Sequence, residues 1–367
     1  MKLAVYPYNN DFTPVIRYRE LLKENVEIIP ISPIGFSLHN KDAGLSDNGC
    51  QCNITVVSDF DKIIKYVDKL FICESHYSID YQKSIKPKII QAINNKKEII
   101  LTIDISQEET ESLGRLAKEN NVKIEFFNRL INNYSHFFNP KKKNKFLQDI
   151  SVPVVFVLGL SENAKKFETQ LSLYWEITKM GYKIALIGSR HYCERFNFFS
   201  FPNFMFTKDF TETEKILMFN QYVKNIELTK NPDLIIIGIP GGIMPLSKRF
   251  STKFGITAFL VSNALSADIA LLNIYFENYE TTNIFEKYSL SVQYKLNTML
   301  DYFVISNVKN DFTESSFSFQ PNFLFVGNDA VETVKNRVNI MSTPVYSLQN
   351  ELDRANMAKN LIEKLQS

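Results

Sequence analysis

Apolar and polar positions alternate along this chain in two patterns. Short apolar runs are typical of strands, and between them apolar residues recur at every third or fourth position, which is typical of helices. At 13–24 and 58–70 the helical spacing marks one apolar face. Because strands that alternate with helices favour a parallel sheet, residues 1–138 predict an N-terminal α/β domain of four or five strands. The strands predicted there are 2–8, 26–32, 71–74, 97–104 and 122–127.

The alternation resumes after residue 152 with longer apolar runs. The strand predicted at 153–159 leads into a helix, and a long helix at 212–228 leads into a continuous apolar strand within 231–242, of the kind that is buried on both faces. Residues 152–367 therefore predict a second α/β domain with a C-terminal α/β extension that ends in a closing helix. We expect both parallel-sheet domains to be Rossmann-like or P-loop-like. The remaining segments are a strand at 181–190, apolar segments at 255–262 and 268–276, strands at 301–306 and 323–327, and the closing helix at 350–367.

The tract at 139–151 separates the two patterns. It carries four lysines and no regular apolar spacing, which is typical of a solvated linker. Contact of these lysines with a phosphate or an acidic peptide is the alternative. We interpret the tract as a Lys-rich linker.

Composition narrows the classes of function. The chain has 367 residues, of which 45% are hydrophobic and 22% charged, as in soluble globular proteins. A formal net charge of +2 gives no electrostatic case for nucleic acid. No apolar run approaches the roughly 18 residues of a membrane span, so we expect a cytoplasmic protein without a membrane partner. The four cysteines are scattered, which predicts free thiols and no metal site, and the sequence does not specify an oligomeric state.

The stretch GLSENAKK, residues 159–166, lies where a strand turns into a helix. A phosphate loop places backbone amides and a helix N-terminus around an anion that a lysine neutralises, usually as G-x-x-x-x-G-K-[ST]. With Lys165 as that lysine, the loop has standard length but lacks the second glycine. With Lys166, the loop is one residue longer, Lys165 replaces the glycine, and a hydroxyl follows only at Thr169. We favour the longer register.

A second glycine cluster, IPGG at 239–242, follows the apolar strand within 231–242. Ligands of open α/β sheets bind at the carboxyl ends of strands, so this cluster and the loop are expected to meet. The expected ligand is ATP or another phosphate-bearing molecule, held without the standard protein ligands of Mg²⁺. The candidate binding residues are Gly159, Ser161, Asn163, Lys165, Lys166, Thr169, Ser189, Arg190, Gly241 and Gly242.

The glycine-started segment 188–206 is rich in aromatic residues and contains Arg190, His191 and Cys193. Arg190 and His191 can face an anion held by the first loop, and Cys193 is a candidate nucleophile. No second catalytic partner is visible in the sequence, so no catalytic residue is assigned. Core packing is the favoured interpretation of the phenylalanines.

The longer register and the 231–242 segment resemble the dethiobiotin-synthetase-like branch of P-loop enzymes. In that branch an extended loop ends in a lysine, and a strand ends in an acidic residue followed by two small residues and two glycines. Here Gly238 occupies the acidic position, and Asp233 lies at the opposite end of the strand. Both usual protein ligands of Mg²⁺ are therefore missing, which argues against ordinary triphosphate hydrolysis.

Several long segments together resemble a clostridial family of peptide maturation system proteins: 5–22, 159–171, 181–206 and 231–245. That resemblance implies a role beside a radical SAM maturase and a Cys-rich, bacteriocin-like precursor peptide, and it implies no defined reaction. The family's loop is closer to a glycine-lysine P-loop, and Lys165 departs from it. Two main hypotheses remain open: an accessory protein of peptide maturation that binds a phosphate or nucleotide, and a non-catalytic scaffold that recruits the precursor peptide or the maturase. A third, a transferase with the N-terminal α/β domain as acceptor site, rests only on the two-domain layout.

Overall fold

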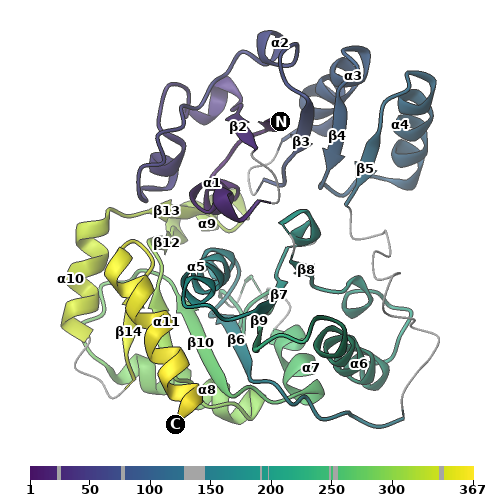
Figure 1. Ribbon diagram of the computed structural model, residues 1–367. Coiled ribbons are helices and arrows are strands. Elements are labelled where there is room, and N and C mark those ends of the chain that lie inside the picture. The colour runs from purple at the N-terminus through teal and green to yellow at the C-terminus, as the bar shows by residue number, and fades with distance from the viewer. Residues whose placement is uncertain are drawn as a thin grey trace. The chain divides into compact units, whose positions relative to one another are not determined.

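The computed structural model describes residues 1–22, 26–75, 79–127, 145–190, 192–196, 198–247, 249–250, 255–338 and 343–367 (Figure 1). The chain divides into two compact units. The first comprises Met1–Ile131 with Arg195–Asn197, and the second comprises Asn132–Glu194 with Phe198–Ser367. Residues 139–144 of the predicted linker lie outside the described residues, so the predicted linker and domain boundaries stay predictions.

The first unit is built on a five-stranded parallel sheet in the order β2-β1-β3-β4-β5. Its strands are β1 (Lys2–Tyr6), β2 (Glu27–Pro30), β3 (Lys69–Ile72), β4 (Glu98–Leu101) and β5 (Ile124–Phe126), and its α-helices are α1 (Thr13–Arg17), α2 (Phe60–Ile63), α3 (Lys86–Asn94) and α4 (Gln107–Glu119).

Local sequence explains where these helices begin and end. Helix α4 starts after Ser106, whose side chain accepts a hydrogen bond from the Glu109 N–H, and it buries Leu113 and Ala117 on its apolar face. The predicted helix at 58–70 is too long, because α2 ends at Ile63 and strand β3 already begins at Lys69. Periodicity alone did not separate the end of that helix from the apolar strand that follows.

The second unit is built on a seven-stranded sheet in the order β14-β11-β10-β6-β9-β7-β8, in which every pairing is parallel. A separate antiparallel pair joins β12 (Val308–Asn310) to β13 (Phe323–Phe325). The main-sheet strands are β6 (Val154–Gly159), β7 (Ile184–Gly188), β8 (Phe199–Ser200), β9 (Leu234–Gly238), β10 (Ile269–Ile274), β11 (Tyr302–Ile305) and β14 (Val345–Ser347).

Helices cover both faces of this sheet. Helix α5 packs on β6, β7 and β9 and contacts α11, whereas α6 contacts α7 and α7 contacts α8 (Figure 1). Because crossovers between parallel strands are right-handed, α5 and α11 lie on one face of the sheet, and α6, α7 and α8 lie on the other. The helices are α5 (Lys166–Lys179), α6 (Glu212–Lys230), α7 (Ile256–Ala264), α8 (Asn283–Leu296), α9 (Phe312–Ser318), α10 (Asn328–Val338) and α11 (Glu351–Gln366).

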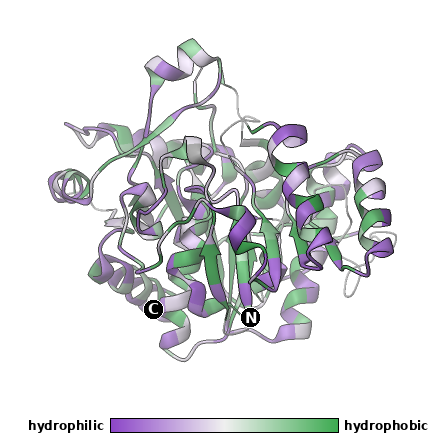
Figure 2. Ribbon diagram, turned by 90° about the horizontal axis from the view of Figure 1, so that it is seen from above, coloured by the Kyte–Doolittle hydropathy of each residue, from purple (hydrophilic) through white to green (hydrophobic). Residues whose placement is uncertain are grey.

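The core of the second unit lies along its central strands. Every residue of β6, β9 and β10 is buried, and Figure 2 shows the strands as mainly hydrophobic, whereas hydrophilic residues gather on the helices. The predicted fold class, two parallel-sheet α/β units, is confirmed. Among the described residues no helix is long and apolar enough to cross a membrane.

Strand β6 occupies the position that matters for ligand binding. The chain leaves β6 through α5 toward β7 on one side, and later crosses to β10 on the other side. Ligands of such sheets bind where the strand order reverses, outside the carboxyl ends of the strands. The carboxyl ends of β6, β9 and β10 meet there.

Candidate functional site

The loop between β6 and α5 keeps the backbone form of a glycine-rich loop although its residues differ. Asn163 and Lys165 are left-handed, with φ of 59° and 60°. That conformation costs a residue with a side chain roughly 1–2 kcal/mol, which is why glycine is usual there. Lys165 therefore adopts the conformation of the glycine that it replaces in the longer register.

Lys166 is the first residue of α5, and its side chain folds back over the loop. Only 7% of it is exposed, and its ammonium donates hydrogen bonds to the Ser161 carbonyl at 3.3 Å and to the Gly241 carbonyl at 2.6 Å. A Cβ on Gly159 would lie 2.7 Å from the Lys166 Nζ, so the lysine occupies space that only glycine leaves open. Gly159, Ser161, Lys166 and Gly241 are thus brought together.

Burial controls the charge of Lys166. Desolvation lowers its pKa from 10.5 to about 8; the Glu162 carboxylate opposes the shift and the Arg190 guanidinium adds to it. Arg190, a predicted cation of the site, thus adds to the lowering of the Lys166 pKa. With its pKa at about 8, Lys166 can lose or keep its proton near neutral pH after a modest change in its surroundings.

The glycine cluster after β9 packs directly on the loop. The Ile243 N–H donates to the Gly159 carbonyl at 2.9 Å, and the Met244 N–H donates to the Leu160 carbonyl at 3.3 Å. A Cβ on Gly242 would lie 2.3 Å from the Ser161 Cα, so this approach requires glycine. The two glycine segments meet backbone to backbone, as the sequence predicted.

Several loop amides remain available to an anion. Among the described residues, no acceptor takes a hydrogen bond from the backbone N–H of Glu162, Asn163, Ala164, Lys166 or Phe167. These groups precede or begin a 14-residue helix, whose N-terminal dipole favours negative charge.

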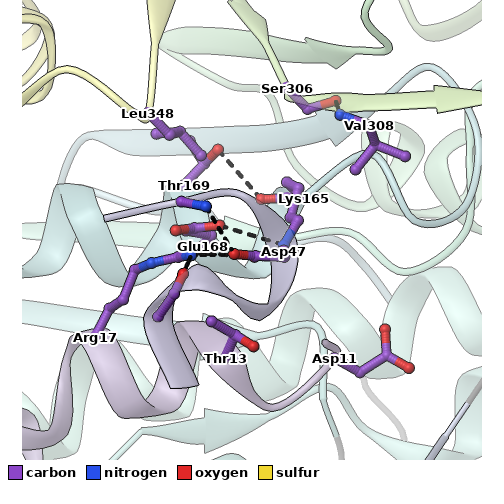
Figure 3. Close-up of polar contacts among 12 residues, drawn as sticks. Asp11, Thr13, Arg17, Asp47, Lys165, Glu168, Thr169, Ser306, Val308 and Leu348 are labelled. Carbon is purple, nitrogen blue, oxygen red and sulfur yellow. Dashed lines mark hydrogen bonds and ion pairs between the residues drawn. The ribbon is translucent and has the colours of Figure 1, made fainter. Parts of the chain in front are cut away.

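The acidic residues of this region do not cap these amides. Glu162 is exposed, whereas Glu168 is buried and pairs with Lys165, at 3.7 Å between Nζ and Oε2 (Figure 3). Lys165 also lies over the Phe325 ring, 5.1 Å from its centre. The side chain of Lys165 is thus engaged in a local pair, and Lys166 is the lysine of the loop.

The positions that normally hold Mg²⁺ do not fit a metal ion. Phe167, next to Lys166, stands in the place of the hydroxyl residue, and it packs edge-on against Tyr192 with ring centres 6.3 Å apart. A Cβ on Gly238, at the end of β9, would lie 2.0 Å from the Gln170 amide carbon. Asp233 accepts a hydrogen bond from the Lys183 N–H at 2.7 Å, at the opposite end of the strand. Within the described part of the chain, no group of three or more His, Cys, Asp or Glu residues is placed to hold a metal.

Gln170 joins the loop helix to the end of β7. Its Nε2 donates to the Ser189 Oγ at 3.1 Å, and its Oε1 accepts from the Ser189 N–H at 3.0 Å. Ser189 is therefore held by the protein, and Arg190 follows it directly. The sequence offered one signal for Gln170: it lies four residues after Lys166, on the same helical face.

Thr169 serves the fold of the loop. It is fully buried, and its hydroxyl accepts from Asn273 Nδ2 at 2.6 Å while it lies 3.5 Å from the Lys165 carbonyl oxygen. Asn273 pairs in register with Gly159, and its carbonyl accepts from the Leu160 N–H at 2.7 Å. Sequence reasoning missed Asn273, although an amide inside the apolar run of 268–276 was a signal.

Tyr275 is a second residue that the sequence analysis missed. Its hydroxyl donates to the Glu162 carbonyl, and it also bonds the Ser161 side chain. Burial raises the pKa of this phenol far above its usual value. Tyr275 therefore stays neutral and anchors the loop from the end of β10.

The aromatic segment after β7 belongs to the core. Cys193 is fully buried and fills the space beside Gly188, where a Cβ would lie 2.2 Å from its Sγ. His191 lies outside the described residues. The segment's buried aromatic residues are Tyr192, Phe196, Phe198, Phe201 and Phe204. Core packing, the favoured interpretation, is confirmed for Phe201 and Phe204, which lie in the hydrophobic core of the second unit.

Fold and site together define a protein class: an α/β protein with two parallel-sheet units, of which the second carries a P-loop-like strand–loop–helix with a lysine at the helix start. No protein-family model matches the sequence, and no curated protein matches it. Among solved structures, a DUF1611 family protein from Anabaena variabilis is similar over 100% of this chain and 99% of that one, with a TM-score of 0.61 and 10% identity. At that identity the likeness concerns the fold alone.

Partial likenesses involve two further structures. The hydrogenase maturation factor HypB from Archaeoglobus fulgidus matches 58% of this chain and 89% of that one, with a TM-score of 0.31 and 14% identity. Cobyrinic acid a,c-diamide synthase from Mycobacterium smegmatis, with bound ADP and magnesium, matches 59% of this chain and 96% of that one, with a TM-score of 0.33 and 13% identity. Both likenesses are too partial to bear on the ligand of this chain.

Proposed function

We propose that this protein binds a phosphate-bearing ligand, such as ATP, at the loop from Gly159 to Lys166. One observation carries the proposal: a buried lysine begins a helix whose preceding loop offers amides with no acceptor among the described residues. A phosphate group satisfies both features, because it accepts hydrogen bonds from the amides and neutralises the ammonium. We further propose that the binding serves the maturation of a ribosomally synthesised, radical-SAM-modified peptide, as the resemblance in sequence implies.

Each residue of the site has a role in this proposal. The amides of the loop orient the phosphate, Lys166 supplies positive charge, and the Gly241–Gly242 turn closes over the loop. The ammonium of Lys166 exchanges its carbonyl acceptors for phosphate oxygens. Because a phosphate oxygen carries negative charge and a carbonyl oxygen does not, that exchange adds charge–charge attraction and favours the bound state.

Binding is proposed here without ordinary hydrolysis. Phe167 and Gly238 stand where a hydroxyl and a carboxylate would hold Mg²⁺, and Gln170 fills the space beside Gly238. Hydrolysis of the usual kind depends on that metal. The proposed role is therefore to bind or sense the ligand as an accessory to another enzyme.

Isothermal titration tests the binding. Wild-type protein titrated with ATP, GTP, pyrophosphate and phosphate is expected to bind at least one of them, and Lys166→Ala is expected to lose at least about tenfold in affinity. Lys183→Ala is the matched control, since Lys183 is exposed and lies directly before β7, at the edge of the sheet opposite the loop. Absence of binding by the wild type rejects the proposal.

A second candidate function is a non-catalytic scaffold that recruits the precursor peptide or the maturase. It is favoured by exposed apolar side chains on α9 and around β13, since such groups are typical of partner surfaces. Pull-down with the precursor peptide and the maturase tests it: Phe317→Ser combined with Phe319→Ser should abolish capture, and recovery of neither partner by the wild type rejects it. The side chains are Phe312 (56% exposed), Phe317 (76%), Phe319 (78%) and Leu324 (51%).

A further inference from the structure

Gln170 fills the space that the side chain of a magnesium-binding carboxylate at position 238 would need. In the P-loop proteins that this loop resembles, that carboxylate belongs to the acidic residue at the end of the strand. Gly238 occupies that position here. Three atoms of the Gln170 amide lie within 2.0–2.1 Å of a Cβ built on Gly238. Gln170 is fully buried, and both ends of its amide are bonded to Ser189. The amide is therefore a fixed part of the site.

A neutral amide cannot replace the charge of a metal ion. A cation follows the residue that Gln170 bonds: Ser189 is held by two hydrogen bonds, at 3.1 and 3.0 Å, and Arg190 is the next residue. The Arg190 guanidinium is near enough to Lys166 to disfavour its positive charge. Two cations that disfavour each other's charge, one after β6 and one after β7, favour a ligand with several negative charges.

We infer that the site takes its phosphate-bearing ligand free of divalent cation, with Gln170 positioning Arg190 to supply the positive charge that Mg²⁺ supplies elsewhere. This inference rests on the proposed function and specifies its ligand class: a polyphosphate or nucleotide in its metal-free form. A guanidinium suits that role, because it is always charged and its planar fork matches two phosphate oxygens.

Titration with and without metal tests the inference. Wild-type protein is titrated with pyrophosphate and with ATP, in EDTA and in excess Mg²⁺. Binding in EDTA is expected to be at least as tight as in Mg²⁺, because the metal neutralises charges that Lys166 and Arg190 would otherwise bind. Binding that is about tenfold or more tighter in Mg²⁺ overturns the inference and leaves the proposed function standing. Absence of binding under both conditions overturns both.

The isosteric variant Gln170→Glu gives a sharper test. Its carboxylate keeps the shape of the amide and can still accept from Ser189, so the fold is expected to persist. The new negative charge should weaken binding in EDTA by about tenfold, and Mg²⁺ should restore it. Gln320→Glu, a change at an exposed glutamine outside the site, should show neither effect. A Gln170→Glu protein whose affinity is unchanged in EDTA contradicts the inference.

Arg190→Gln keeps the inference testable if Gln170→Glu does not fold. Loss of the guanidinium is expected to weaken pyrophosphate binding in EDTA by about tenfold or more. The loss in Mg²⁺ should be smaller, since the metal then carries part of the charge. Unchanged affinity of Arg190→Gln in EDTA contradicts the role assigned to Arg190.

Discussion

The Lys166 ammonium donates a 2.6 Å hydrogen bond to the Gly241 carbonyl, across the two glycine segments of the second unit. The amine begins helix α5, and the carbonyl belongs to the turn that follows β9. A ligand phosphate would compete for the same ammonium, so ligand binding and the position of the Gly241 turn are coupled. This contact also gives the buried amine a hydrogen-bond acceptor, which offsets part of the cost of its burial.

The first prediction concerns pH. Burial holds the pKa of Lys166 at about 8, below its ordinary value of 10.5. Between these values the unfolded chain binds more protons at this residue, so the free energy of unfolding rises with pH. Between pH 7 and 9.5, Lys166 should contribute a rise of about 2 kcal/mol. Urea unfolding of wild type and Lys166→Met at both pH values measures this difference.

The affinity for the ligand should change in the opposite direction. A phosphate binds the charged ammonium, so affinity should fall by up to about tenfold for each pH unit above 8. Phosphate titrations at pH 7, 8 and 9 follow this fall. Equal pH dependence in wild type and Lys166→Met, in unfolding or in binding, would show that Lys166 is not the titrating group.

The second prediction concerns the close approach of the two glycine segments. Gly242→Ala places a methyl group 2.3 Å from the Ser161 Cα, which is backbone and cannot turn aside. The protein should lose about 2–4 kcal/mol of stability, because the segments must separate. Gly241→Ala meets no atom within 4 Å, and its cost should be limited to the strain of its φ of 82°, about 1 kcal/mol. Urea unfolding of the two variants ranks them, and the reverse order would refute the packing argument.

The fold followed from the sequence where the pattern was long and regular. Strands β6 and β9 are continuous apolar runs, and α6 begins at the capping box of Thr211 and Glu214. Two short strands were not predicted: β8, which has 2 residues, and β14, which has 3. The segment 255–262 is mainly apolar and forms helix α7, a case in which periodicity does not separate a helix from a buried strand.

The site was visible in the sequence where contacts are local or follow from the meeting of strand ends. Gly159 and Lys166 lie in one loop, and the expected meeting of strand ends brought in Gly241 and Gly242. The bond between Thr169 and Asn273 joins residues 104 positions apart, and nothing in either segment specifies that pairing. Likewise, the backbone conformation of Lys165 depends on tertiary context. The sequence shows only that Lys165 replaces a glycine of the motif. The structure shows that Lys165 still adopts the left-handed backbone conformation.

The third prediction concerns that replacement. Lys165→Gly should relieve roughly 1–2 kcal/mol of backbone strain but remove a cationic partner of the buried Glu168 carboxylate, which costs about 3–5 kcal/mol. The net result should be a loss of about 2 kcal/mol in the free energy of unfolding. Adding Glu168→Gln should recover most of it, since the carboxylate that lost its cationic partner is then neutral. A stabilised Lys165→Gly protein would mean that the pair with Glu168 contributes little.

The fourth prediction separates the positioning of the loop from stability. Tyr275 donates to the Glu162 carbonyl and bonds Ser161, so Tyr275→Phe releases the first half of the loop. Stability should fall by about 1 kcal/mol, and affinity for pyrophosphate by about three- to tenfold. Tyr279→Phe is the matched control, because its buried hydroxyl donates to the Tyr275 carbonyl at 2.9 Å and does not touch the loop. It should show the same loss of stability with unchanged affinity. Equal losses of affinity in both variants would mean that Tyr275 acts through general packing and does not position the loop.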